Sequence, residues 1–386
     1  MSSPLPYWRI AGLYFWYFAF VGAFSPFFGP YLQALGRSAW EIGVLLGLMA
    51  LARIVAANFW AWRADRNGRR EHVLRVSLAL STLAWIAVFP ARDFATLAAV
   101  LAAVAFCSGG AVPLTEAITF GRLRGDFGRY GGIRLWGSVG FIVAVLGVGF
   151  ALDFVEIARL PWIVLVTLVG AFAHALAIPA APHPRAERGD SVLPMLVRPE
   201  IARFLTACFL MSMGHGTLYG FYSILLADNG YSKGFVGAMW SIGVVAEIVA
   251  FLAMPMLMRR FGAGPILVAS FATAVVRFVA IGWLVASPVA LALAQVLHGT
   301  TFGTYHAAAL AVVQRWFSGS RQTRGQAVYL SISFGAGGMA GSLLSGALWD
   351  VVGPAWTFTA SSAAAAAGWL LVARRPNEYD SRPAST

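Results

Sequence analysis

The chain has 386 residues, of which 59% are hydrophobic and 11% are charged, and it includes 14 Trp and 28 Phe. A soluble domain carries about a quarter charged residues, and one or two soluble cores could not bury this much apolar surface. The composition therefore excludes a soluble globular protein and indicates a polytopic membrane protein. The net charge of +12 does not indicate nucleic acid binding, because the 28 Lys and Arg residues lie in short clusters between apolar runs.

The apolar segment nearest the N-terminus is about 25 residues long. It lacks a small-residue cleavage site and exceeds the length of a signal-peptide core, so we expect it to remain as a spanning helix. Cys107 and Cys208 lie in apolar stretches about a hundred residues apart. This spacing fits neither a metal site nor a disulfide framework, so we expect packing residues and no bound metal.

Twelve apolar runs are long enough to cross a bilayer as helices, which need about 20 residues each. In chain order the runs cover residues 8–33, 40–62, 73–90, 94–120, 134–152, 159–180, 201–227, 235–257, 265–286, 289–314, 326–349 and 355–373. Barrel strands are shorter and alternate between apolar and polar residues, which these runs do not. We therefore predict an all-α membrane protein with twelve transmembrane helices.

The distribution of basic residues predicts the orientation of the chain, because short cytoplasmic loops are enriched in Lys and Arg. With the N-terminus in the cytoplasm, twenty basic residues fall on the cytoplasmic side and four on the opposite side. We therefore expect both termini in the cytoplasm and a multi-pass protein of the cell inner membrane.

A polar, proline-rich segment at 181–200 separates two predicted six-helix halves, residues 1–180 and 201–386, the second of which ends in a short cytoplasmic tail. A displacement of 194 residues aligns several positions of the two halves. The aligned pairs are Gly36 with Gly230, Ser38 with Ser232, Gly43 with Gly237, and Gly68 with Gly262. Two parallel repeats around a central path are typical of transporters.

The loop after the second run contains the sequence Asp65-Arg66-x-Gly68-Arg69-Arg70. It resembles the DRxGRR signature of the major facilitator superfamily, and the resemblance implies the twelve-helix fold of that family and a conformational latch in this loop. Chemically, Asp65 can accept from the start of a neighbouring helix, and the arginines can bind helix C-termini or anionic lipid. Charge that only sets the topology is the alternative.

Glu116 lies in GAVPLTEAIT, and Arg134 follows eighteen residues later in RLWGS. This pair resembles the helix-four glutamate and helix-five arginine of the lactose-permease-like proton symporters, and RLWGS, GVVAE and LHGTTF are most similar to the phenylpropionate permease branch. The resemblance implies that Glu116 and Arg134 bind substrate. Independently, the planar guanidinium of Arg134 suits a carboxylate. The alternatives are an ion pair that only joins helices and, for Arg134, a cytoplasmic anchor.

Ionisable side chains inside predicted spans are candidates for function, because burying a charge in the membrane is costly. Glu247 in the eighth run is our candidate proton carrier. His298 and His306 lie about two turns apart on one face of the tenth run, and histidine titrates near neutral pH. Hydrogen-bonded histidines that only join helices are the alternative.

The resemblance also carries His298 over directly and Arg277 approximately as proton-site residues. The acid expected one turn after His298 is Thr301 and the lysine expected before it is Gln295, so a differently wired proton route stays open. Arg53 is either a contact lining the cavity or part of a structural ion pair. The family layout also implies that Glu247 lies near Arg134 and Glu116, in a cluster that couples proton and substrate.

Aromatic residues crowd the first and seventh runs, and most must pack or face lipid. A minority can hold an aromatic ring of a substrate. His215 lies among glycines that permit either a close backbone approach or a break of the helix near the binding site. The candidate contacts are Tyr14, Phe18, Phe28, His215, Tyr219 and Tyr222.

These features predict a proton-coupled importer of a small organic solute, which works by alternating access as a monomer. A phenylpropionate-like carboxylate is favoured, and sugars and nucleosides follow. We expect a proton gradient and no cofactor, because GxxxxGK[ST] is absent and Lys233 is the only lysine. The expected partners are the lipid bilayer, protons and the solute, without nucleic acid. One alternative is a proton-driven exporter of hydrophobic compounds. A remote one is an intramembrane enzyme with His298 as base, for which no catalytic partner is recognisable.

Overall fold

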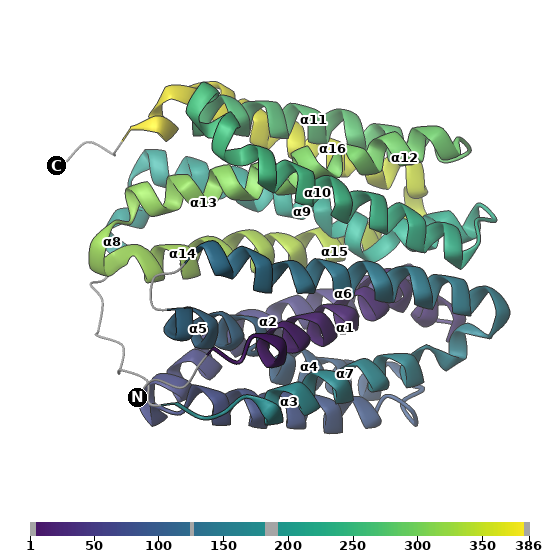
Figure 1. The fold of residues 1–386 in the computed structure, drawn as a ribbon. Coiled ribbons are helices and arrows are strands. Elements are labelled where there is room, and N and C mark those ends of the chain that lie inside the picture. Colours follow the sequence, from purple (N-terminus) through teal and green to yellow (C-terminus); the bar gives the residue numbers. More distant parts are fainter. Residues whose placement is uncertain (1–4, 124–126, 182–191, 382–386) are drawn as a thin grey trace. The chain divides into compact units, whose positions relative to one another are not determined.

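The computed structural model describes residues 5–123, 127–181 and 192–381, and these residues are helical with no β-strand among them (Figure 1). They divide into two compact units. The first comprises Met1–Ala186 with Ser232–Ala238, and the second comprises Glu187–Tyr231 with Met239–Thr386. Residues 182–191 of the predicted linker lie outside the described residues. The all-α prediction is confirmed for the part of the chain that the structure describes.

The first unit contains seven α-helices and one short 3₁₀ helix among its described residues before the linker. They are α1 (Tyr7–Ala34), α2 (Ala39–Asn67), α3 (Arg70–Ile86), α4 (Phe94–Ser108), α5 (Ala111–Leu123), α6 (Phe127–Phe154), η1 (Ile157–Arg159) and α7 (Leu160–Ala177). Helix α1 packs against α6 and α7. At the contact with α6, a Cβ at Gly140 would lie 2.1 Å from the carbonyl oxygen of Phe15. Only glycine permits so close an approach, which places the aromatic residues of α1 beside α6.

The second unit contains the remaining helices, together with most of α10. They are α8 (Leu193–Leu196), α9 (Pro199–Asp228), α10 (Lys233–Phe261), α11 (Ala263–Trp283), α12 (Pro288–Val296), η2 (Gly299–Thr304), α13 (Tyr305–Trp316), η3 (Gly319–Arg321), α14 (Gln322–Leu330), η4 (Ser331–Gly337), α15 (Gly338–Val352), α16 (Pro354–Ala373) and η5 (Pro376–Asp380). Helix α9 packs against α15 and α16, and α11 packs against α13 and α16. A Cβ at Gly216 would lie 2.8 Å from Gly341, so the predicted close approach at the glycines of the seventh run is confirmed.

Local sequence signals explain where several helices begin and end. Ser38 and Glu41 form a capping box at the start of α2, with the Ser38 hydroxyl accepting from the Glu41 amide at 3.2 Å. Asp93 caps α4, and hydrogen bonds from the Thr96 side chain and amide hold the pKa of the Asp93 carboxyl below its ordinary value. Gly68 ends α2 with φ of +60°, a left-handed conformation that glycine adopts without strain.

Nine helical stretches among the described residues are long and apolar enough to span a membrane. They are Tyr7–Ala34, Ala39–Arg66, Phe94–Leu123, Arg129–Phe154, Ile157–Ala177, Lys233–Phe261, Ala263–Trp283, Gln322–Val352 and Pro354–Ala373. The predicted runs 73–90, 201–227 and 289–314 are also helical. However, α3 has only 17 residues, the continuous helix α9 carries several polar side chains, and α12 ends at Val296, before η2 and α13. The count of twelve spans stays a prediction.

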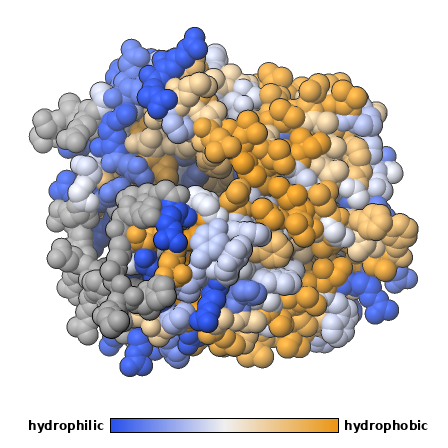
Figure 2. All heavy atoms as spheres, in the orientation of Figure 1, coloured by the Kyte–Doolittle hydropathy of each residue, from blue (hydrophilic) through white to orange (hydrophobic). Residues whose placement is uncertain are grey.

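Apolar side chains cover much of the surface along the helices, and hydrophilic residues gather at the helix ends on the face shown (Figure 2). Large exposed apolar residues include Phe150, Val166, Leu252 and Leu370. So many exposed apolar side chains would be unfavourable in water. An apolar surface of this kind is expected where lipid is the solvent.

Candidate functional site

Glu116 and Arg134 come together in the first unit, on α5 and α6. The Tyr130 hydroxyl of α6 donates to Glu116 Oε1 at 3.3 Å. The guanidinium carbon of Arg134 lies 4.2 Å from the centre of the Phe18 ring and 5.6 Å from that of Tyr14, both on α1. Arg134 is therefore held by cation–π contacts, which place its positive charge over the faces of two aromatic rings.

The guanidinium of Arg134 is available to a ligand. Within the described residues it makes no hydrogen bond, and its nitrogens do not approach the Glu116 oxygens within the 4.0 Å of an ion pair. The Arg134 and Glu116 side chains are both only partly buried. A guanidinium presents five N–H donors in a planar fork, so this site can bind a carboxylate bidentately.

Gly137, one turn after Arg134, makes this arrangement possible. A Cβ at Gly137 would lie 2.7 Å from an Arg134 guanidinium nitrogen and 2.9 Å from the Phe18 ring. The glycine of RLWGS therefore leaves the space in which the guanidinium rests on the ring. Sequence reasoning singled out this sequence for its arginine and missed both Gly137 and Tyr130, although the glycine stands in the same pattern.

Phe28 lies away from this site, in the packed core of the first unit. Its side chain is 1% exposed and its ring stacks on Phe24 at 4.3 Å, with Tyr31 at 5.5 Å and Trp85 of α3 at 5.9 Å. In this conformation Phe28 takes part in packing, and its role as a substrate contact stays a prediction.

Arg53 lies in the middle of α2 and is exposed, without an ion pair among the described residues. A guanidinium at mid-span is not stable against lipid tails, since each charge there needs water or a polar partner. Its placement favours the interpretation that Arg53 lines a hydrated cavity over that of a structural pair.

In the second unit, Glu247 of α10 pairs with His298. Glu247 Oε1 lies 2.7 Å from His298 Nε2. Two glycines of η2 allow it to lie close to α10. A Cβ at Gly299 would lie 2.5 Å from the Ala246 carbonyl oxygen, and one at Gly303 would lie 3.0 Å from Ala250. The expected cluster of Glu247 with Arg134 and Glu116 would cross the two units and stays a prediction.

Phe302 joins His298 to His306 in a stack of three rings. Ring centres are 5.4 Å apart for His298 and Phe302 and 6.0 Å apart for Phe302 and His306, with planes within 15° and 14° of parallel. The stack follows η2, a π-helical segment whose wider turns bring every fourth side chain into line. His306 Nδ1 also lies 3.2 Å from the Tyr329 hydroxyl. The prediction that both histidines share one face is confirmed.

Arg277 of α11 is fully buried and hydrogen-bonds to neutral acceptors. Its guanidinium donates to the Ala294 carbonyl at 2.7 Å, to the Thr301 hydroxyl at 3.0 Å and to the Gln295 side-chain oxygen at 3.2 Å. Thr301 and Gln295 are the two positions at which the chain departs from the lactose permease pattern. They therefore hold Arg277 with neutral oxygens in place of ionisable groups.

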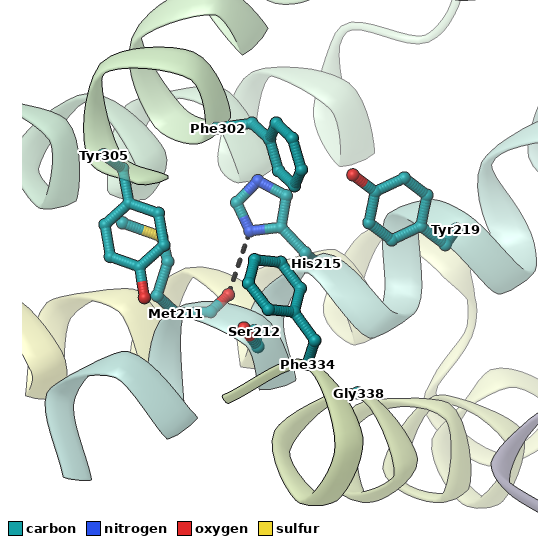
Figure 3. A pocket seen from close by; sticks show the side chains of 8 residues that line it. All are labelled: Met211, Ser212, His215, Tyr219, Phe302, Tyr305, Phe334 and Gly338. Atoms are coloured by element: carbon teal, nitrogen blue, oxygen red, sulfur yellow. Dashed lines mark hydrogen bonds between the residues drawn. The ribbon is translucent and has the colours of Figure 1, made fainter. Parts of the chain in front are cut away.

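A cavity of about 50 Å³ lies beside His215 on α9 (Figure 3). It is lined by Met211, Ser212, His215, Tyr219, Phe302, Tyr305, Phe334 and Gly338. His215 Nδ1 lies 2.9 Å from the Met211 carbonyl oxygen and must carry the proton, because a carbonyl only accepts. His215 Nε2 is then an acceptor, and it is buried without a partner among the described residues. The cavity has room for a few water molecules, and within its largely apolar wall the free Nε2 of His215 can accept from a small donor.

Tyr219 and Tyr222 lie differently. Tyr219 lines the cavity and stacks on Trp240 at 5.8 Å. Tyr222 is fully buried with its ring 6.1 Å from that of Trp240, and it is not part of the cavity wall. The structure therefore brings Tyr219 and His215 together and places Tyr222 in the packing behind them.

The loop motif forms a short network at the junction of α2 and α3. Asp65 pairs with Arg70 at the start of α3 at 3.6 Å, and the Arg66 guanidinium lies 5.6 Å from the Trp62 ring centre. Gly68 closes α2 and Arg69 precedes α3. The expectation that Asp65 interacts with the start of a neighbouring helix agrees with this pairing, while the latch function stays a prediction.

Other arginines bind the C-terminal carbonyls of α7. Arg9 donates to Ala177 at 2.9 Å, Arg75 donates to Ala175 at 3.2 Å and to Ile178 at 2.5 Å, and Arg122 donates to Pro179. Arg122 also pairs with the buried Glu71 at 2.8 Å. Sequence reasoning assigned such a role to the loop arginines, but three other elements supply it, because α1, α3 and α5 are the ones that carry arginines beside this helix end.

Comparisons with known proteins agree with this architecture. The MFS_1 like family matches residues 7–360. A probable 3-phenylpropionic acid transporter of Escherichia coli (strain K12) is 32% identical over 90% of this chain and 92% of its own length. The maltose permease of Geobacillus stearothermophilus is 25% identical over 87% of this chain and 86% of its own. The crystal structure of the nucleoside transporter NupG has a TM-score of 0.82 at 16% identity, covering 95% of this chain and 98% of that chain.

Proposed function

From the premise that the chain belongs to the MFS_1 like family of the major facilitator superfamily, we propose that it imports a small organic carboxylate together with protons. The chain is a transporter and not an enzyme, as the family match and the relatives indicate. The proposal includes twelve spans, cytoplasmic termini, a location in the cell inner membrane, a monomer, and a proton gradient in place of a cofactor.

The observation that carries the substrate class is the state of Arg134. Its guanidinium is partly exposed, makes no hydrogen bond among the described residues and rests on the Phe18 ring. An unpaired guanidinium inside a membrane protein gains most from an anion, and its fork matches the two oxygens of a carboxylate. A carboxylate bound there would lie close to the rings of Phe18 and Tyr14.

The aromatic setting favours an arylalkanoate such as 3-phenylpropionate. Phe120 and Tyr130 stack at 4.5 Å beside Glu116, so further aromatic side chains lie near the charged pair. The relative named as a probable 3-phenylpropionic acid transporter matches nearly the whole chain, which supports the same class. Stacking on aromatic side chains would hold the ring of such a solute, while Arg134 would hold its carboxylate.

The proposed proton carrier is the Glu247 and His298 pair. The two side chains share a hydrogen bond of 2.7 Å, in which one proton can reside on either group. Arg277, which also has an electrostatic interaction with Glu247, is held by neutral acceptors and supplies a fixed positive charge. A carboxylate that gains and loses a proton beside a fixed cation can link protonation to movement of the transporter.

A neutral solute is a second candidate, and Glu116 favours it. The Glu116 carboxylate is partly exposed and can accept from sugar hydroxyls as well as from Tyr130. One relative is named a maltose permease, which agrees with this interpretation. Export of hydrophobic compounds gains no specific support from Arg134, because a guanidinium disfavours an apolar ligand.

The test uses purified protein in proteoliposomes that enclose a pH dye. We expect 3-phenylpropionate to acidify the interior and maltose and uridine to leave it unchanged, after subtraction of the signal from protein-free liposomes. Arg134→Lys should raise the half-saturating concentration about tenfold or more, because it removes hydrogen bonds to a charged group that contribute about 1.5–3 kcal/mol. Arg37→Lys, outside the site, is the control. Acidification by maltose or uridine alone, or by none of the three, contradicts the proposal.

A further inference from the structure

The second unit lacks the acidic residue of the loop motif. At the displacement of 194 residues, Asp65 corresponds to Arg259 and Arg70 corresponds to Gly264, whereas the glycine is kept as Gly262. Gly262 precedes α11 with φ of +77° and has no side chain to cap that helix. Of the first four residues of α11, Ala263, Gly264 and Ile266 carry a backbone N–H and Pro265 does not, so these three donors need an acceptor from water or from elsewhere in the chain.

The acceptor is Asp380, near the end of the described chain. Its two carboxylate oxygens accept from the amides of Ala263 at 2.6 Å and Gly264 at 3.2 Å. A carboxylate at a helix N-terminus forms charge-assisted hydrogen bonds and opposes the helix dipole. Asp380 thus occupies the N-terminus of α11, a helix of 21 residues.

Two neighbouring arginines hold the segment that carries Asp380. Arg203 of α9 pairs with Glu378, and Arg315 of α13 lies 3.6 Å from Asp380 while also donating to the Tyr379 carbonyl. These contacts lie at or beyond the ends of the predicted spans and join the ends of α9, α11 and α13.

Tyr379 anchors the same segment. Its side chain is fully buried, with ring centres 5.7 Å from Phe204 and 5.8 Å from Trp316. The Trp316 indole donates to the Ser381 carbonyl at 3.0 Å. A buried aromatic anchor flanked by two acidic side chains, Glu378 and Asp380, is a complementary ligand for a basic and aromatic surface.

Two glycines at the start of α11, Gly262 just before the helix and Gly264 within it, leave space for the segment. A Cβ at Gly264 would lie 2.0 Å from the Pro376 carbonyl oxygen, and one at Gly262 would lie 2.7 Å from the Asp380 carboxylate. Both glycines therefore leave space that the segment fills, which is a second feature, independent of the hydrogen bonds, that matches this surface to this partner.

We propose that residues 376–381 form a C-terminal clasp, an acidic segment that replaces the lost acid of the second loop motif and holds α9, α11 and α13 together. The receptor surface consists of the N-terminus of α11 with Arg203, Arg315 and the Phe204–Trp316 pocket. Helix α11 carries Arg277 and α13 carries His306, so the clasp fixes the ends of two helices of the buried polar cluster. This inference does not depend on the solute or on proton coupling.

Hydrogen–deuterium exchange of the full-length protein in detergent tests the clasp. Asp380→Asn should speed exchange of the amides of Ala263, Gly264 and Ile266 about three- to thirtyfold, the range for loss of a helix cap. A chain that ends after Arg375 should show the same change and extend it to the ends of α9 and α13. A chain that ends after Ser381, and Asp350→Asn on exposed α15, should leave exchange unchanged.

Gly264→Ala distinguishes loss of the clasp from a general destabilisation of the protein. Alanine has a higher helix propensity than glycine, so without a clasp this change should slow exchange at the start of α11. With the clasp, the added Cβ displaces Pro376 and exchange becomes faster. A synthetic peptide RRPNEYDS, added to the chain that ends after Arg375, should restore protection, and its Asp→Asn form should not. Unchanged exchange in Asp380→Asn together with slower exchange in Gly264→Ala would overturn the proposal.

Discussion

At the scale of single residues, the space beside Arg134 matters as much as its charge. Gly137→Ala would place a Cβ 2.7 Å from the guanidinium, whose flexible end can move away without disturbing the helix. The Cβ would also lie 2.9 Å from the Phe18 ring, so we expect normal folding in which the higher helix propensity of alanine is offset by a small displacement of that ring. The half-saturating concentration of the carboxylate should rise about fivefold, because a displaced guanidinium weakens a hydrogen bond to a charged group by about 1 kcal/mol. Uptake kinetics in proteoliposomes measure this.

The matched control for this variant is Gly131→Ala, in the same helix, where a Cβ would meet no atom within 4 Å. If Gly137→Ala transports with wild-type affinity, Arg134 does not need the Phe18 face to bind its ligand. If both variants lose affinity equally, the effect comes from the helix and not from the guanidinium.

The candidate site residues could be predicted from the sequence where an ionisable group interrupts an apolar helix. Glu116, Arg134, Glu247 and His298 were found because ionisable groups are rare in apolar runs. Tyr130 and Phe302 were missed, because one aromatic residue among 28 Phe and 11 Tyr carries no signal of its partner. Such partners depend on tertiary contacts, which a single sequence does not report.

At the scale of elements, the end of α7 depends on arginines from other helices. Arg75→Gln removes charge-assisted bonds to the carbonyls of Ala175 and Ile178. We expect the free energy of unfolding to fall by about 1–3 kcal/mol and the apparent melting temperature in detergent to fall by roughly 2–6 °C. Arg92→Gln is the control, since Arg92 interacts with the adjacent Ala91 and with Tyr31 of α1 rather than with the carbonyls at the end of α7. Equal melting temperatures for the two variants would argue against this capping role.

The helices themselves follow from the apolar runs, and Ser38 with Glu41 is a capping signal visible in the sequence. The π-helices η2 and η4 could not be predicted in this way. Each widens the turn over a few residues without changing the apolar pattern, so hydrophobic periodicity does not register it.

At the scale of the whole molecule, the internal repeat locates matching turns in both units. Gly36 and Gly230 have φ of +74° and +81°, and Gly68 and Gly262 have φ of +60° and +77°. The displacement found in the sequence therefore pairs glycines that share a positive φ. It could not show that the second unit recruits Asp380, because that acid lies outside the repeated segment.

The proposed carboxylate site lies in the first unit and the proposed proton site in the second, so coupling would be a property of the whole molecule. Glu247→Gln keeps the size and a hydrogen bond to His298 but cannot release a proton. We expect this variant to lose uphill accumulation of 3-phenylpropionate in an imposed pH gradient while it retains exchange of labelled for unlabelled solute across the membrane. Exchange needs only alternating access, whereas accumulation needs the proton to enter and leave. Asp350→Asn should retain both activities. Accumulation by Glu247→Gln at the wild-type level would exclude Glu247 as the proton carrier and move attention to His306 and Glu116.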